Sequence, residues 1–234
     1  MNSTLPPTPD ADSGATPEAF AADAIFVAAP APVVAAPFEQ LNLPAAVIAN
    51  LTRLGYHAMT PIQAASLPVA LAGHDLIAQA KTGSGKTAAF ALALLDRLNA
   101  RSFAVQALVL CPTRELAEQV TQEIRRLARS EENIKILSLC GGTPIRPQAD
   151  SLEHGAHIVV GTPGRLMDHI SRGSLKLDGL ATLVLDEADR MLDMGFFDDI
   201  AYVAKACPKS RQTLLFSATY PEGVVRLARQ FMRQ

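Results

Sequence analysis

The sequence has few aromatic rings and few cysteines, and each shortage argues against a class of protein. Its 234 residues include no Trp, three Tyr and nine Phe, too few for an extended platform on which nucleic-acid bases stack. Cys111, Cys140 and Cys207 lie far apart and form no CxxC pair. This pattern favours neither a disulfide framework nor a zinc site. It indicates buried free thiols in a reducing compartment, and we expect a cytoplasmic protein.

Positive charge is missing from the N-terminal part of the chain. Residues 1–52 contain five acids and no Lys or Arg, whereas the other 182 residues hold all 21 basic residues and 18 acids. The formal charge of -2 therefore combines -5 in the first segment with +3 in the remainder. A mildly basic folded part leaves nucleic acid open as a partner.

The first 37 residues lack the composition of a folded domain, since they contain 11 Ala and 7 Pro. The apolar stretch 19–38 has neither the positive start of a secretory signal nor the strongly apolar residues of a membrane-spanning helix. We predict a flexible leader over 1–37 and one folded domain over 38–234, with no membrane association.

Short apolar runs alternate with amphipathic stretches after residue 38, which is typical of a doubly wound α/β domain with a parallel sheet. The near-continuous runs are typical of strands buried on both faces, and we expect strands at 75–79, 106–111, 135–140, 157–161, 182–186 and 212–216. We expect helices at 44–54, 61–72, 86–99, 114–129, 146–154, 163–172, 188–206 and 221–232. Thr60 and Thr162, each followed by proline, are predicted helix caps. Ligands of such folds bind beyond the C-terminal ends of the strands.

A glycine-rich loop follows the first of these strands and runs directly into a helix. It reads Ala80, Lys81, Thr82, Gly83, Ser84, Gly85, Lys86, Thr87. Backbone N–H groups at a helix start bind phosphate, Lys86 is placed to reach the β- and γ-phosphates, and the Thr87 hydroxyl is placed to hold Mg²⁺. Ala80 departs from the usual pattern, which has Gly at this position. The loop predicts a nucleoside triphosphate site; a glycine-rich turn without a ligand is the alternative.

A second acidic segment should lie at the same edge of the sheet. The apolar run 182–185 ends in Asp186, which Glu187 and then Asp189 follow. Because this edge also holds the phosphate loop, we predict that Asp186 is the other Mg²⁺ partner and that Glu187 polarises the attacking water. The alternative is an acid-rich helix start favoured by the helix dipole.

The tetrad Asp186-Glu-Ala-Asp189 after such a loop resembles the DEAD-box RNA helicase family, and further segments match that family in order from about residue 38 to the end. The segment from Gly55 to Gln63 resembles its adenine-reading Q motif, with Phe38 lying 17 residues before Gly55. The resemblance implies that Gln63 selects ATP and that Tyr56 stacks on the base. An exposed helix residue is the alternative for Gln63, and a core residue is the alternative for Phe38.

Three other segments resemble the RNA-contacting motifs of the family. Their residues are Pro112, Thr113 and Arg114, then Gly141 and Gly142, then Thr162, Gly164 and Arg165. The resemblance implies that RNA is held by its phosphates and riboses, largely independently of sequence, which agrees with the scarcity of rings. Surface ion pairs are the alternative for the two arginines. Ser217 and Thr219 belong to a segment that resembles the coupling motif, which acts together with Asp189.

The resemblance implies a RecA-like P-loop fold and a second RecA-like lobe, which supplies arginine fingers; nothing after Thr219 resembles that lobe. We expect a monomeric first lobe of an ATP-dependent RNA helicase, nearly inactive alone, that hydrolyses ATP and unwinds RNA when joined to its second lobe. Segments such as 211–219 resemble a bacterial subfamily that acts in ribosome assembly. A P-loop ATPase acting on DNA or protein, or a nucleotide-binding fragment without turnover, is the alternative.

Overall fold

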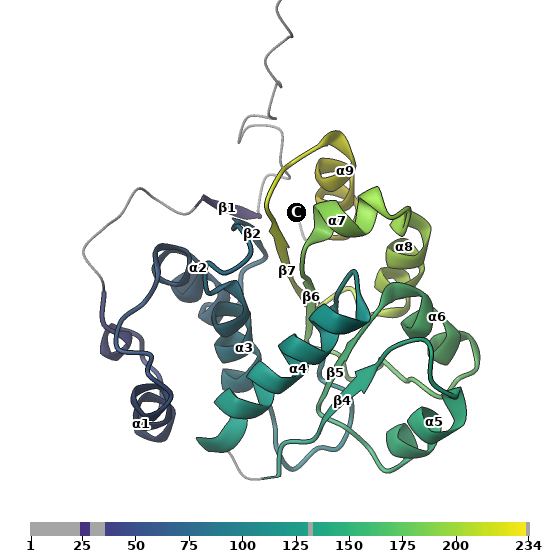
Figure 1. The fold of residues 1–234 in the computed structure, drawn as a ribbon, viewed down its shortest axis with the longest axis horizontal. Coiled ribbons are helices and arrows are strands. Elements are labelled where there is room, and N and C mark those ends of the chain that lie inside the picture. The colour runs from purple at the N-terminus through teal and green to yellow at the C-terminus, as the bar shows by residue number, and fades with distance from the viewer. Residues whose placement is uncertain (1–23, 29–35, 131–132, 233–234) are drawn as a thin grey trace, which may run out of the picture.

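A parallel sheet of seven strands runs through the part of the chain that the computed structural model describes, residues 24–28, 36–130 and 133–232 (Figure 1). The strand order is β1-β2-β7-β6-β3-β5-β4, and all neighbours pair in parallel. The strands are β1 Ile25–Ala28, β2 Leu76–Gln79, β3 Ala107–Leu110, β4 Ile136–Leu139, β5 Ile158–Gly161, β6 Thr182–Leu185 and β7 Gln212–Ser217. The predicted doubly wound fold is confirmed, and the six expected strands end within one residue of their predicted ends.

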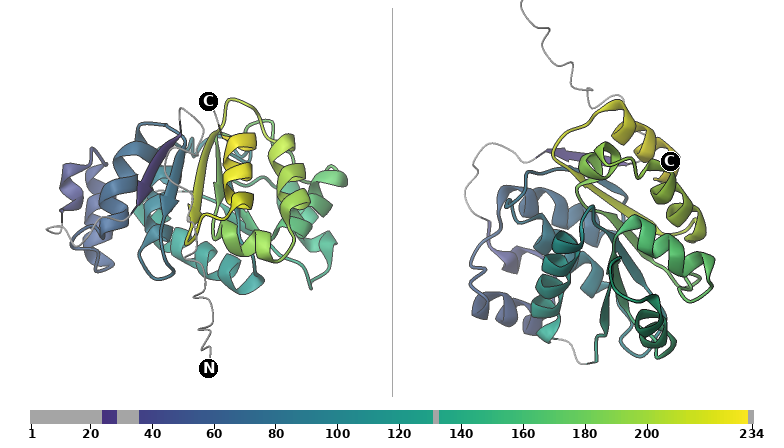
Figure 2. Two further views of the ribbon diagram at one scale, coloured as in Figure 1. Left: turned by 90° about the horizontal axis from the view of Figure 1, so that it is seen from above. Right: turned by 45° about the vertical axis from the view of Figure 1, so that its right-hand side comes forward.

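Helices cover both faces of this sheet, with α1 to α4 on one side and α5 to α9 on the other (Figure 2). They are α1 Ala45–Arg53, α2 Pro61–Leu71, α3 Lys86–Asp96, α4 Arg114–Leu127, α5 Ile145–Glu153, α6 Pro163–Ser171, α7 Ala188–Asp193, α8 Phe197–Ala206 and α9 Glu222–Phe231, with short 3₁₀ helices at Phe38–Gln40 and Ala128–Ser130. Within the described ranges, every helix is too short or too polar to cross a membrane.

Side-chain alternation along the strands divides the interior into two cores. On β2, Leu76 and Ala78 pack with α1 to α4, whereas Ile77 packs with the helices of the opposite face. Leu214 and Leu215 of β7 divide in the same way. Because successive strand residues point to opposite faces, a sheet covered twice needs apolar residues at nearly every position. The continuous apolar runs in the sequence follow from this requirement.

The structure differs from the predicted leader at β1. Ile25–Ala28 pairs in register with Leu76–Gln79 of β2, and Phe26 packs edge to face on Tyr220 with ring centroids 5.2 Å apart. A β-branched and aromatic tetrapeptide can extend an open sheet edge even when Ala and Pro surround it. Residues 1–23 and 29–35 of the predicted leader lie outside the described residues.

Two local predictions at helix ends are also corrected. The helix expected over 188–206 is divided into α7 and α8 at Gly195, whose φ of +83° suits glycine and ends the first helix. Thr60 caps α2 in a reciprocal capping box with Gln63, but the Thr162 side chain makes no capping hydrogen bond to α6. Pro163 at the first position of α6 fixes φ for the helix and has no N–H, so α6 begins at this proline without a side-chain cap.

Candidate functional site

The strand order sorts the predicted site residues into two groups at one edge of the sheet. The neighbouring strands β2, β7 and β6 lead into the phosphate loop 80–87 and the segments 217–219 and 186–189. The next strands, β3, β5 and β4, lead into 112–114, 162–165 and 141–142. Since the C-terminal ends of parallel strands share an edge, the segments predicted to bind nucleotide lie beside those predicted to bind RNA.

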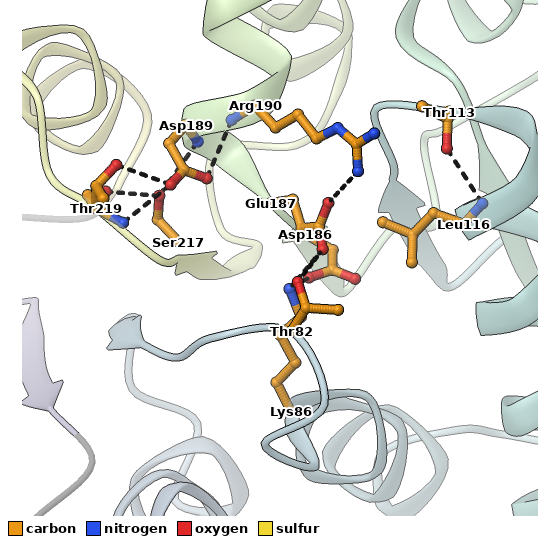
Figure 3. A network of polar contacts seen from close by, with 10 residues as sticks. All are labelled: Thr82, Lys86, Thr113, Leu116, Asp186, Glu187, Asp189, Arg190, Ser217 and Thr219. Atoms are coloured by element: carbon orange, nitrogen blue, oxygen red, sulfur yellow. Dashed lines mark hydrogen bonds and ion pairs between the residues drawn. The ribbon is translucent and has the colours of Figure 1, made fainter.

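Lys86 joins the phosphate loop to the acidic segment. It opens α3 directly after Gly85, whose φ of +90° is available to glycine at little cost. Its side chain is buried, and Nζ lies 2.9 Å from Oδ1 of Asp186 and 3.3 Å from Oε1 of Glu187 (Figure 3). Lys86 is therefore in contact with Asp186 and Glu187, and these are the three residues predicted from the sequence to act in hydrolysis of the triphosphate.

Asp186 has the surroundings of a carboxylate that can accept a metal ion. It is fully buried, and its Oδ2 has no hydrogen-bond partner among the described residues. Burial raises its pKa, and the nearby Lys86 ammonium opposes that rise. Magnesium sites commonly use one or two carboxylates together with substrate phosphates and water. Thr87, the other predicted Mg²⁺ partner, is half-buried at the start of α3 and lines the cavity beside the phosphate loop.

Glu187 is held in a backbone conformation that few residues other than glycine adopt, with φ 53° and ψ 53°. Its Oε1 accepts a hydrogen bond from Thr82 at 2.9 Å, and its Oε2 accepts one from Arg190 at 3.3 Å (Figure 3). Burial alone would raise the pKa of Glu187, but Lys86 and these donors outweigh it and lower the pKa. The residue is therefore ionised at neutral pH.

A cavity of about 420 Å³ opens beside the phosphate loop. The loop forms one wall, and Tyr56 forms another part of the lining. The remaining wall is a face of α4 that the sequence analysis did not single out, namely Leu116, Gln119, Val120 and Glu123. These four residues are spaced three or four positions apart, so they share one face of the helix. That spacing is the signal in the sequence that could have identified them. The Tyr56 hydroxyl donates a hydrogen bond to Glu123, which fixes the ring against α4.

Gln63 is buried, so the interpretation as an exposed helix residue is wrong. Its Oε1 accepts from the Thr60 backbone N–H at 2.9 Å, and its Nε2 donates to the Gly85 carbonyl at 3.0 Å. The side chain thus ties the start of α2 to the phosphate loop. Phe38 is 2% exposed and packs edge to face on Tyr56, as a core residue would.

The predicted coupling residues form one hydrogen-bonded group. Oδ2 of Asp189 accepts from the Thr219 backbone N–H at 2.9 Å and from its hydroxyl at 2.8 Å (Figure 3). The Asp189 backbone N–H donates to the Ser217 hydroxyl at 3.2 Å. Burial alone would raise the pKa of Asp189, but the hydrogen bonds from Thr219 outweigh it, and the pKa is lowered. The start of α7 is thereby tied to the end of β7.

The loop after β3 turns directly into α4. Pro112 is buried, and the Thr113 hydroxyl accepts a hydrogen bond from the Leu116 backbone N–H at 3.2 Å, which caps α4 (Figure 3). Arg114 is exposed, and its guanidinium lies against Gly142, where an added Cβ would come within 1.7 Å of Nη1. Gly142 also has a φ of +82°. Two of the predicted RNA segments are therefore in contact.

The third segment predicted to bind RNA also contacts the turn of residues 140–143, which contains Gly141 and Gly142 and is called the glycine turn below. Arg165 donates from Nη2 to the Thr143 carbonyl at 2.9 Å and from Nη1 to Oε1 of Gln148 at 2.7 Å. The surface ion pair named as its alternative is only marginal, because Nε lies 3.9 Å from Asp168. Thr162 has an extended backbone before α6, and Gly164 lies in the first turn of that helix. Gln148 belongs to none of the predicted motifs, and no sequence signal pointed to it.

Comparisons with known proteins agree with this arrangement. The DEAD/DEAH box helicase family matches residues 60–227. The chain is 60% identical over 197 residues to the ATP-dependent RNA helicase DbpA of Escherichia coli strain K12, covering 84% of this chain and 43% of DbpA. It is 50% identical over 196 residues to the DEAD-box ATP-dependent RNA helicase CshA of Streptococcus pneumoniae, covering 84% of this chain and 37% of CshA.

A solved structure extends the likeness to three dimensions. The crystal structure of a DEAD box protein from the hyperthermophile Methanococcus jannaschii matches with a TM-score of 0.80 and 43% identity, over 84% of this chain and 53% of that one. The chain spans less than half the length of the curated relatives named above. The family match covers most of the chain, and the fold and site geometry agree with it, so this chain belongs to the DEAD/DEAH box helicase family.

Proposed function

We propose that this chain is the ATP-binding first lobe of an ATP-dependent RNA helicase. Together with a second RecA-like lobe, it hydrolyses ATP with Mg²⁺ and separates short RNA duplexes, acting as a monomer in the cytoplasm. The observation that carries the proposal is the contact of Lys86 with Asp186 and Glu187 beside the cavity of about 420 Å³. We assign residues 38–234 to this lobe, together with β1, which extends its sheet.

The phosphate loop holds the triphosphate. Backbone N–H groups of residues 80–87 bind its oxygens, and Lys86 exchanges its carboxylate partners for the β- and γ-phosphates. Thr87 and the buried Asp186 would hold Mg²⁺, which when bound neutralises charge on the transferred phosphoryl group. Tyr56 lines the base side of the site. Gln63 is buried behind Gly85, and its carboxamide selects adenine after releasing a bond it now makes to the protein.

Glu187 positions and polarises the attacking water. Its lowered pKa keeps it ionised, as a proton acceptor must be at neutral pH. Thr82 and Arg190 hold its two oxygens in fixed directions. The group Asp189, Ser217 and Thr219 transmits the state of the nucleotide to the rest of the lobe.

RNA is bound at the neighbouring part of the same edge. Arg114 and Arg165 contact phosphates, helped by the N-termini of α4 and α6. The other residues of this surface are Pro112, Thr113, Gly141, Gly142, Thr162 and Gly164. A role in ribosome assembly is the narrower proposal, and it is supported by the likeness to DbpA.

The proposal is tested in a two-lobe protein made by joining this chain to the second lobe of DbpA. We expect ATP hydrolysis that RNA stimulates more strongly than DNA of the same sequence. Glu187→Gln should keep ATP binding and lose hydrolysis, because only the group that acts on water is changed. Stimulation by DNA alone would favour the competing ATPase, and ATP binding without any hydrolysis would favour a fragment that has no turnover.

A further inference from the structure

Gln148 lies on α5, between the two loops proposed to bind RNA after β4 and β5. Its Nε2 donates to the Cys140 carbonyl at 3.0 Å and to the Thr143 hydroxyl at 3.1 Å. Its Oε1 accepts from Arg165 at 2.7 Å and lies 2.9 Å from Nε2 of His169. A carboxamide has two donor hydrogens and two acceptor lone pairs, so all four are used here.

The same contacts show which ring nitrogen of His169 donates to Gln148. Because Oε1 of Gln148 only accepts, Nε2 of His169 carries the hydrogen, and Nδ1 is left facing the Ser174 hydroxyl at 2.8 Å. His169 is fully buried, and burial together with Arg165 lowers its pKa, which favours the neutral ring. The imidazole therefore holds the carboxamide of Gln148 in one orientation.

Gln148 and Arg165 clamp the glycine turn at its two ends. Gln148 binds the Cys140 carbonyl before the turn, and Arg165 binds the Thr143 carbonyl after it. The clamp fixes the intervening Gly141, which is half-buried, and Gly142, which is exposed; neither has a side chain that would keep a phosphate from the backbone. It also fixes two donors of the Arg165 guanidinium, which turns a flexible side chain into a fixed one.

We propose that Gln148 is a positioning residue for RNA binding: it holds the 140–143 turn and Arg165 in the geometry that grips RNA phosphates. This inference rests on the proposed RNA-binding function. The contacts that support it do not depend on RNA, because each hydrogen bond lies within the chain.

The test uses the 234-residue chain with Gln148→Leu, which keeps a similar volume and removes all four hydrogen bonds. Hydrogen exchange of peptides that cover 138–146 should become faster, because the turn loses its clamp. Affinity for a labelled oligouridine should fall about tenfold, the effect of losing charge-assisted positioning, while affinity for a fluorescent ATP analogue stays unchanged. Gln122→Leu, on the exposed face of α4, is the matched control.

Two further variants separate positioning from general damage. Gln148→Glu keeps acceptors for Arg165 and His169 but loses donation to Cys140, so its exchange should be intermediate. In the double variant Gln148→Leu/Arg165→Ala, the loss of RNA affinity should be smaller than the sum of the two single losses, because Gln148 acts in part through Arg165.

Unchanged exchange in Gln148→Leu overturns the inference whether or not the chain binds RNA. Faster exchange with unchanged RNA affinity, or additive losses in the double variant, overturns the positioning role while the proposed function stands. A wild-type chain that binds the ATP analogue but no RNA overturns both the RNA part of the proposed function and this inference, even if exchange is faster.

Discussion

Lys86 compensates a buried acidic pair, and its replacement by Met should destabilise the chain in a pH-dependent way. The lysine is 4% exposed and contacts Asp186, which is 0% exposed, at 2.9 Å. Glu187 keeps Thr82 and Arg190 as partners when Lys86 is lost, whereas Asp186 loses its cation. Removing one partner of a buried pair costs about 3–5 kcal/mol, and we expect a loss near the lower end of that range at neutral pH.

The sign of the pH dependence follows from the direction of the pKa shift. Burial already raises the pKa of Asp186, and loss of the Lys86 charge raises it further. A carboxyl group with a higher pKa in the folded chain holds its proton there while the unfolded chain has lost it. The free energy of unfolding therefore falls as the pH rises through the interval between the two pKa values. The cost of Lys86→Met should be small near the unfolded pKa and full above the folded pKa.

Thermal unfolding at about pH 5 and about pH 7.5 measures this difference. A loss of about 3 kcal/mol lowers Tm by roughly 6–12 °C for a chain of this size. Lys81→Met is the control, because Lys81 is an exposed lysine of the same loop. Lys86→Met/Asp186→Asn should recover most of the loss, since it removes the uncompensated charge. A loss that is the same at both pH values, or that Asp186→Asn does not relieve, would refute the reasoning.

Three smaller changes test other contacts of the site. The pKa of Asp189 is lowered in the folded chain, so its carboxylate stabilises the fold above its unfolded pKa, and this stabilisation is lost as the pH falls through the folded pKa. In Asp189→Asn, the free energy of unfolding measured in urea should therefore fall less on acidification than in the wild type. Gln63→Ala removes the capping box and the bond to the phosphate loop, and should cost about 1–2 kcal/mol in urea unfolding and weaken discrimination between ATP and GTP analogues. Gly142→Ala places a Cβ on the Arg114 guanidinium at a φ of +82°, so it should cost about 1 kcal/mol and weaken binding of oligouridine but not of ATP. An unaltered urea midpoint for Gln63→Ala, or unaltered RNA binding for Gly142→Ala, would contradict these assignments.

Local signals in the sequence were sufficient for the phosphate loop, the strands and most helices. Glycines ahead of a helix, a lysine at its start and an acid at the end of an apolar run each depend on a few adjacent residues. The β1 strand was not predicted, because a four-residue apolar run among Ala and Pro forms a strand only where a sheet edge accepts it.

The sequence by itself determined which residues are candidates for the nucleotide chemistry and that the strands are buried on both faces, because both are encoded at short range. Only the tertiary structure decided how these residues meet. The strand order places Lys86 against Asp186, 100 positions along the chain, and hydrogen bonds from α5 to Arg165 and His169 of α6 hold Gln148 between two loops. Contacts between distant segments depend on how strands order and helices pack, and no local pattern records that arrangement.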